Sequence, residues 1–192
     1  DEPAPRSGPE AGARGKLADL RLWLESTDLA TLTPSFKSVD SVLGILSATP
    51  AALNGLSCGL DPFAWSHEPT PDDWALTEII CHLRDTEREI HQMQIKLFKD
   101  QNEPFIPRPD TSVWASHRDY LHENGISALK EFNDARRETL MLLKKIAPER
   151  SAWGNKARHA IFGPTNFLEV IGFMADHDRM HVQQVWSTLK KF

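Results

Sequence analysis

Two histidines near the C-terminal end are the residues whose type and spacing could do chemistry. His177 and His181 lie four residues apart within the segment ADHDRMHVQQ, residues 175–184. In an α-helix this spacing places both imidazoles one turn apart on one face, next to the apolar Val170 and Met174. Such a pair can direct ring nitrogens to a single metal ion, as in zinc enzymes with a helical histidine pair. Because the chain holds eight histidines, the spacing alone equally allows histidines that only bind carbonyl oxygens beside the core.

A third histidine belongs to a separate helical pattern. A polar line at spacing i, i+4, i+7 and i+11 comprises Glu78, His82, Asp85 and Glu89. His82 has the apolar Ile79 and Leu83 beside it, so we expect it to approach the core. Packed helices lie about 8–10 Å apart, which lets His82 meet the His177–His181 pair. Three neutral imidazoles leave coordination positions open, as in catalytic rather than closed structural sites. The sequence therefore predicts one divalent ion at this site.

Polar residues close to the three histidines could hold the ligand rings in place. A metal-bound histidine usually donates its second ring N–H to a carboxylate or a carbonyl oxygen. Asp85, Asp178 and Gln184 each lie within three residues of a predicted ligand, and we expect them to accept these hydrogen bonds. For the two aspartates, a solvated helix face is the alternative.

The remaining histidines and Cys81 show no spacing that joins them to the metal ligands. His159 comes just before Phe162 and is a candidate for lining the pocket, with a surface loop position as the alternative. Cys81 precedes His82 and would project about 100° away from it around a helix. We therefore expect Cys81 to be a small buried residue, and the sequence identifies no catalytic residue. Four histidines are interpreted as surface residues: His67, His91, His117 and His122.

Long amphipathic segments are the elements that must position these histidines. Apolar residues recur at helical spacing in four of them. They begin near Val39, at the acidic cap Asp72-Asp73, at Ile126, and at Thr165 or Asn166. Proline-bearing loops are expected at residues 102–109 and 148–164, and no run of residues predicts a strand. The pattern predicts an all-α four-helix bundle over residues 39–192.

The first 38 residues differ from the rest of the chain. Residues 1–15 are rich in Pro, Gly, Ala and charge and lack an apolar period. We interpret residues 1–38 as a tail or linker that is partly disordered. Within it, residues 17–24 could form a short amphipathic helix.

Composition and charge exclude several classes of partner. The net charge is −5 and the Lys and Arg residues are scattered, whereas a duplex binder concentrates positive charge on one face. By inspection of the sequence, we expect no apolar run to reach the roughly 18 residues of a membrane span. The chain holds two cysteines and does not start with a signal-peptide pattern. We therefore expect a cytoplasmic protein with a small-molecule substrate and neither nucleic acid nor membrane as partner.

Two motifs resemble those of a known family. The segment WALTEIICHLRDTE, from Trp74 to Glu87, resembles the Trp-x3-Glu-x3-His-Leu-x-Asp-x-Glu signature of the DinB-like superfamily. Residues 162–184 resemble the closing Phe-Gly, helix and His-Asp-x-x-His-x-x-Gln pattern of that family. The resemblance covers about residues 39–192. It implies a four-helix bundle with a metal on one histidine of the second helix and two of the last, by position His82, His177 and His181.

The resemblance also implies a class of chemistry. Family members carry zinc, nickel or iron-type ions, and several resemble transferases or isomerases that use bacillithiol, mycothiol or related thiols. The leading hypothesis is a metal-dependent transferase that joins a low-molecular-weight thiol to a small electrophile, with a homodimer as the candidate assembly. The alternatives are a non-catalytic metal-binding module that serves a partner domain, and a metal-dependent hydrolase.

Overall fold

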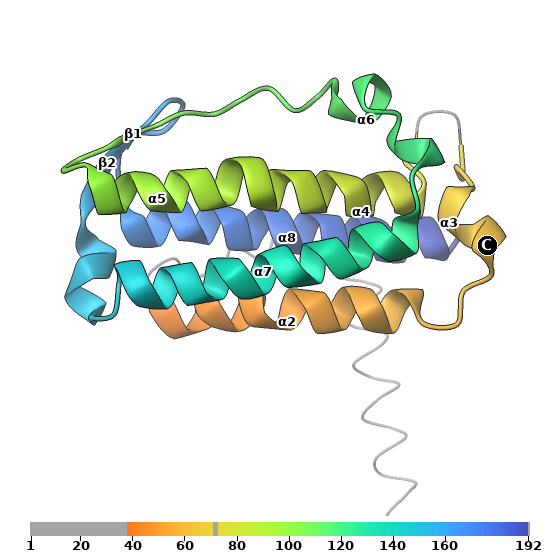
Figure 1. The fold of residues 1–192 in the computed structure, drawn as a ribbon, viewed down its shortest axis with the longest axis horizontal. Coiled ribbons are helices and arrows are strands. Elements are labelled where there is room, and N and C mark those ends of the chain that lie inside the picture. Colours follow the sequence, from red (N-terminus) through yellow and green to blue (C-terminus); the bar gives the residue numbers. More distant parts are fainter. Residues whose placement is uncertain (1–37, 71–72, 192) are drawn as a thin grey trace, which may run out of the picture. The chain divides into compact units, whose positions relative to one another are not determined.

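The computed structural model describes residues 38–70 and 73–191. Within this part of the chain, long helices form a bundle (Figure 1). They are α2 (Val39–Ser57), the continuous helix 76–100, α7 (Gly125–Ile146) and α8 (Phe167–Leu189). The second of these consists of α4 (Leu76–Asp85), the π-helical η2 (Thr86–His91) and α5 (Gln92–Asp100). The predicted all-α four-helix bundle is confirmed, while the predicted helix at residues 17–24 lies outside the described residues.

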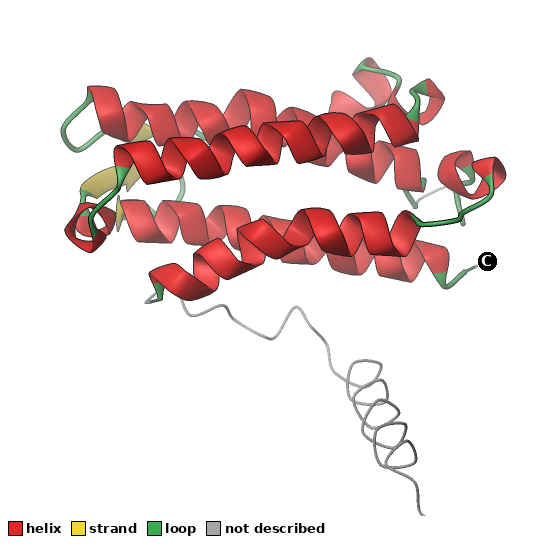
Figure 2. Ribbon diagram, turned by 60° about the horizontal axis from the view of Figure 1, so that its bottom comes forward, coloured by secondary structure: helices red, strands yellow, loops and turns green. Residues whose placement is uncertain are grey.

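The order of the helices in the bundle differs from their order in the chain. Both α2 and the helix α4–α5 pack against α7 and α8. The helices α2 and α8 run in one direction, and α4–α5 and α7 run in the other (Figure 1). Figure 2 shows the four helices as two stacked pairs. Because α4–α5 and α7 are parallel, residues 101–124 must return along the bundle between them; this crossover contains α6 (Trp114–His117) and η3 (Tyr120–His122).

Side-chain caps set where the helices begin. At α8, the Asn166 side chain accepts from the Glu169 N–H at 3.0 Å, and the Glu169 carboxylate accepts from the Asn166 N–H. This reciprocal cap is one of the two positions that the sequence predicted. At α4 the predicted acidic cap was wrong. The helix follows Ala75, whose N–H donates to the Glu78 carboxylate at 2.8 Å. Asp73 lies before this helix and accepts from the Thr70 hydroxyl instead.

A small sheet at one end of the bundle was not predicted. It consists of β1 (Phe105–Ile106), β2 (Lys156–His159) and β3 (Gly163–Asn166), in that order, with β1 parallel and β3 antiparallel to β2. Strands of two to four residues are too short to show the alternation of apolar and polar residues that identifies a strand in a sequence. Gly163 has a φ of +70°, which allows the tight return from β2 into β3. The expected loops therefore pair with each other.

The helix α2 has a composition that the sequence analysis did not anticipate. By length and apolar composition alone it could cross a membrane, and it is the one described helix that could. This finding corrects the expectation that no apolar run reaches that length. In the bundle, Val42, Leu46 and Leu53 of α2 are buried, and core helices of bundles share this composition.

Two short elements complete the described chain: α3 (Pro62–Ser66) and η4 (Arg150–Gly154).

The core consists of two apolar clusters. One gathers residues such as Leu46, Phe98 and Phe167, and the other residues such as Leu53 and Phe132. Between them along the helices lies a layer of buried polar residues. It comprises Thr49, His82, Glu87, His91, Arg136 and Asp178. Because buried polar groups destabilise a core unless they are bound or paired, this layer is where function is expected.

Candidate metal centre

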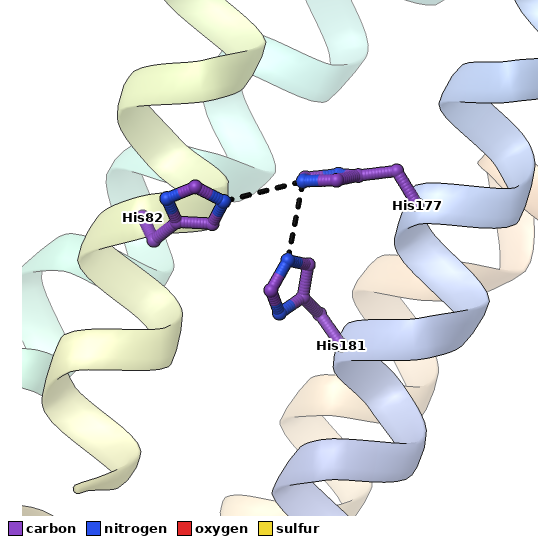
Figure 3. A group of neighbouring side chains, drawn as sticks. All are labelled: His82, His177 and His181. Atoms are coloured by element: carbon purple, nitrogen blue, oxygen red, sulfur yellow. Dashed lines mark hydrogen bonds between the residues drawn. The ribbon is translucent and has the colours of Figure 1, made fainter. Parts of the chain in front are cut away.

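Three imidazoles from two helices converge in the polar layer. His82 comes from α4, and His177 and His181 lie one turn apart on α8 (Figure 3). The Nε2 atom of His177 is 3.2 Å from Nε2 of His82 and 3.1 Å from Nε2 of His181. The ligand atoms of the three residues lie within 4.8 Å of one another. The spacing of His177 and His181 and the predicted meeting with His82 thus correspond to one cluster of nitrogen atoms.

The distances between these nitrogens fit a common metal ion. Zinc–nitrogen bonds of 2.0–2.1 Å in tetrahedral geometry separate neighbouring ligand nitrogens by about 3.3 Å. The two Nε2 contacts of 3.1 and 3.2 Å are close to that separation. Without an ion, Nε2 of His177 has either one hydrogen or one lone pair, and this single group would have to serve both of its neighbouring nitrogens. A divalent ion would satisfy all three lone pairs at once.

Burial keeps the three imidazoles in the form that binds metals. It lowers the pKa of His82 to about 3, and the neighbouring His181 and His91 add to the effect. Burial also lowers the pKa of His177, well below its usual value, and that of His181. A histidine must be neutral to coordinate an ion. At neutral pH the three rings therefore offer lone pairs rather than positive charges.

Neighbouring side chains hold and cover the rings. Oε1 of Gln184 lies 2.8 Å from Nδ1 of His181, which is the contact that the sequence suggested for this residue. The ring of Trp74 is 5.3 Å from that of His82 and 6.4 Å from that of His181, to which it lies parallel. Among the described residues, no partner reaches Nδ1 of His82 or of His177. Of the three rings, the one of His181 is thus held at its Nδ1 by a side-chain hydrogen bond.

Comparisons with known proteins assign the chain to a family. Residues 45–185 match the sequence profile of the DinB superfamily. The chain belongs to the DinB superfamily. Among solved structures it is similar to YfiT from Bacillus subtilis, described as a probable metal-dependent hydrolase with an unusual four-helix bundle topology; the two are 15% identical, with a TM-score of 0.68 over 79% of this chain and 85% of that chain. No curated protein matches it.

Asp85 and Asp178 take part in other contacts than those expected. In this DinB superfamily protein Asp85 accepts hydrogen bonds from Arg84, Arg118 and Tyr120. Asp178 accepts from the Thr49 hydroxyl at 2.7 Å and from Arg136. Asp178 follows His177 directly and so points about 100° away around α8, while Asp85 faces the crossover. Neither carboxylate is hydrogen-bonded to a ring of the site.

Arg136 is the centre of a buried ionic network beside the site. It is 1% exposed and donates to both oxygens of Glu87, each at 2.8 Å, to Asp178, and to the Leu46 carbonyl at 3.0 Å. Burial raises the pKa of Glu87, but the charge and hydrogen bonds of Arg136 outweigh it and leave the pKa well below its usual value. The network therefore holds an ionised carboxylate inside the bundle and joins α2, η2, α7 and α8.

His91 was interpreted as a surface residue, and this was wrong. It is 6% exposed; its Nδ1 lies 2.9 Å from Oε2 of Glu87, and its ring is edge-on to that of His177. In a regular α-helix, the nine positions from His82 to His91 turn by about 900°, which puts the two on opposite sides. The π-helix η2 ends at His91. Its wider turn rotates the chain less per residue and brings His91 back toward the site.

The other candidates lie apart from the three rings. His159, on β2, is 8% exposed and its Nδ1 accepts from the N–H groups of Ile161 and Phe162. Its ring stacks on Phe162 and lies 5.7 Å from Phe173, one turn before His177 on α8. Cys81 is fully buried, and burial raises its pKa to about 12. Of the remaining histidines, His117 and His122 are exposed, as expected, whereas His67 is partly buried.

Proposed function

We propose that this DinB superfamily protein is a metal-dependent enzyme that joins a low-molecular-weight thiol to a small electrophilic molecule. Its ion, a divalent zinc, nickel or iron-type metal, would be held by Nε2 of His82, His177 and His181. The observation that carries the proposal is the meeting of these three nitrogens at separations that suit a common ion. Three protein ligands leave room for a further ligand, as in catalytic sites.

The state of Cys81 supports a nucleophile that is a separate small molecule and not a side chain of the protein. Cys81, the cysteine closest in sequence to the site, is enclosed in an apolar cluster with its thiol protonated at neutral pH. A bound divalent ion supplies the activation, because it lowers the pKa of a thiol or water at its open position. The imidazoles hold the ion, Gln184 orients His181, and Trp74 covers two of the rings.

A second candidate is hydrolysis, with water in place of the thiol. The similar structure YfiT is described as a probable metal-dependent hydrolase, and three neutral imidazoles serve both reactions. A third, the non-catalytic module, would hold the ion without turnover. The acidic net charge of −5 supports a small-molecule substrate over nucleic acid in each case.

The proposal is tested with the purified full chain. Elemental analysis should find about one divalent ion per chain. The loaded protein should conjugate a small thiol such as 2-mercaptoethanol to 1-chloro-2,4-dinitrobenzene faster than the free ion does. His82→Ala should lose both the ion and the reaction, whereas the exposed control His122→Ala should lose neither. Ester hydrolysis without any thiol would favour the second candidate, and a bound ion with neither reaction would favour the module.

A further inference from the structure

His91 is a buried histidine beside the site that the proposed function does not use. Its ring centroid lies 5.4 Å from that of His177, with the two planes at 86°. Burial is the main cause of the lowered pKa values of His82, His177 and His181, and the nearby His91 lowers them further. Among the described residues, the group of ligand atoms within 4.8 Å of one another contains those three histidines and not His91. His91 is therefore next to the site without belonging to its ligands.

The bond to Glu87 determines which nitrogen of His91 carries hydrogen. Glu87 is 1% exposed and is held by two hydrogen bonds from Arg136. The arginine keeps the carboxylate ionised, and an ionised carboxylate can only accept. Nδ1 of His91, 2.9 Å from Oε2 of Glu87, must therefore be the donor. In the neutral ring this leaves Nε2 as a hydrogen-bond acceptor.

The helix that carries Glu87 and His91 departs from regular α-helical geometry. The π-helix η2 starts at Thr86 and ends at His91, and it contains Glu87 as well. Turns of this kind are rare and occur frequently at functional sites. In this protein, Glu87 of η2 contacts Arg136, and His91 of η2 faces His177. In a regular α-helix, His82 and His91 would lie on opposite sides and could not both face the site.

We infer that His91 is a positioning residue of the metal centre, whose Nε2 accepts a hydrogen bond from an N–H or O–H group of a small ligand held there. The inference rests on the proposed function in one respect, since it requires a bound ion. It adds a preference: of two ligands of similar size, the one that keeps a donor hydrogen is favoured by His91.

The test uses the full chain loaded with Co(II), whose visible spectrum reports ligand binding. Two probes are titrated: hydroxylamine, which keeps donor hydrogens when bound, and thiocyanate, which has none. His91→Leu should bind Co(II) like the wild type but should bind hydroxylamine about five- to tenfold more weakly relative to thiocyanate, as expected for one lost hydrogen bond. His122→Leu, a histidine with its side chain 75% exposed, should leave both affinities unchanged.

Each other outcome overturns the role of His91. Equal changes for both probes, or none, would show that His91 only fills space. Selective weakening of thiocyanate would show that Nε2 donates. If the wild type takes up no Co(II), the proposed function fails too, whereas normal uptake with an unchanged ratio removes His91 alone. Should His91→Leu not fold, long-range ¹H–¹⁵N spectra of the zinc-loaded wild type decide: hydrogen on Nδ1 supports the inference and hydrogen on Nε2 overturns it.

Discussion

The imidazole of His82 is buried and those of His177 and His181 are half-buried, and this links the stability of the protein to pH. Burial lowers the pKa of His82 to about 3 and lowers those of His177 and His181, while an unfolded histidine titrates near 6.5. Below about pH 6.5 the unfolded chain therefore binds more protons than the folded one. Protonation then favours unfolding increasingly as the pH falls, down to the folded pKa values.

We expect the unfolding free energy of the metal-free protein to be constant above about pH 7 and to fall from about pH 6.5 toward pH 3. The slope should be up to about 1.4 kcal/mol per pH unit for each buried histidine. Urea denaturation at a series of pH values measures it. His82→Leu removes one of these bases, so its slope should be shallower. An equal slope in both proteins would show that His82 is not held neutral by burial.

At the scale of the elements, two helical glycines differ in whether the fold has room for a side chain. A Cβ on Gly125, the first residue of α7, would come within 2.4 Å of the Trp65 ring and 2.6 Å of the Thr77 hydroxyl. A Cβ on Gly44, in the second turn of α2, would meet nothing within 4 Å. Gly125 therefore allows α7 to begin against α3 and α4, whereas Gly44 only weakens its helix.

This contrast gives a matched pair of substitutions. Gly125→Ala should lower the unfolding free energy by about 1–3 kcal/mol through overpacking. Gly44→Ala should raise it by about 0.5–1 kcal/mol through better helix propensity. Thermal or urea denaturation of both variants measures the two effects. Stabilisation by Gly125→Ala would mean that Trp65 moves aside at little cost.

The same scale explains how much could be predicted from the sequence. Spacing within one regular helix was sufficient to place His177 beside His181, and the capping residues narrowed the start of α8 to Thr165 or Asn166. His91 could not be placed, because the π-helical turn that redirects it leaves no periodic signal. Asp178 is a different case: its direction follows from its helical phase, but its partner Arg136 lies 42 positions away. A pattern local to α8 cannot show that contact.

At the scale of the whole described bundle, Arg136 joins the helices across the polar layer. It binds Glu87 of η2, Asp178 of α8 and the Leu46 carbonyl of α2 from its place on α7. The apolar clusters on either side stabilise the two halves of the bundle, while this residue fixes how the helices meet between them. Removing it would leave two buried carboxylates without their cation, which costs far more than the loss of a surface ion pair.

We therefore expect Arg136→Met to lower the unfolding free energy by about 3–5 kcal/mol. The neighbouring Arg137 pairs with Asp134 on the surface, where its side chain is 74% exposed, and Arg137→Met should cost no more than about 1 kcal/mol. Combining Arg136→Met with Glu87→Gln and Asp178→Asn removes the stranded charges, so the triple variant should regain part of the loss. Urea denaturation near pH 7 separates the cases. If the triple variant is no more stable than Arg136→Met, the hydrogen-bond geometry of the guanidinium, rather than its charge, holds the helices together.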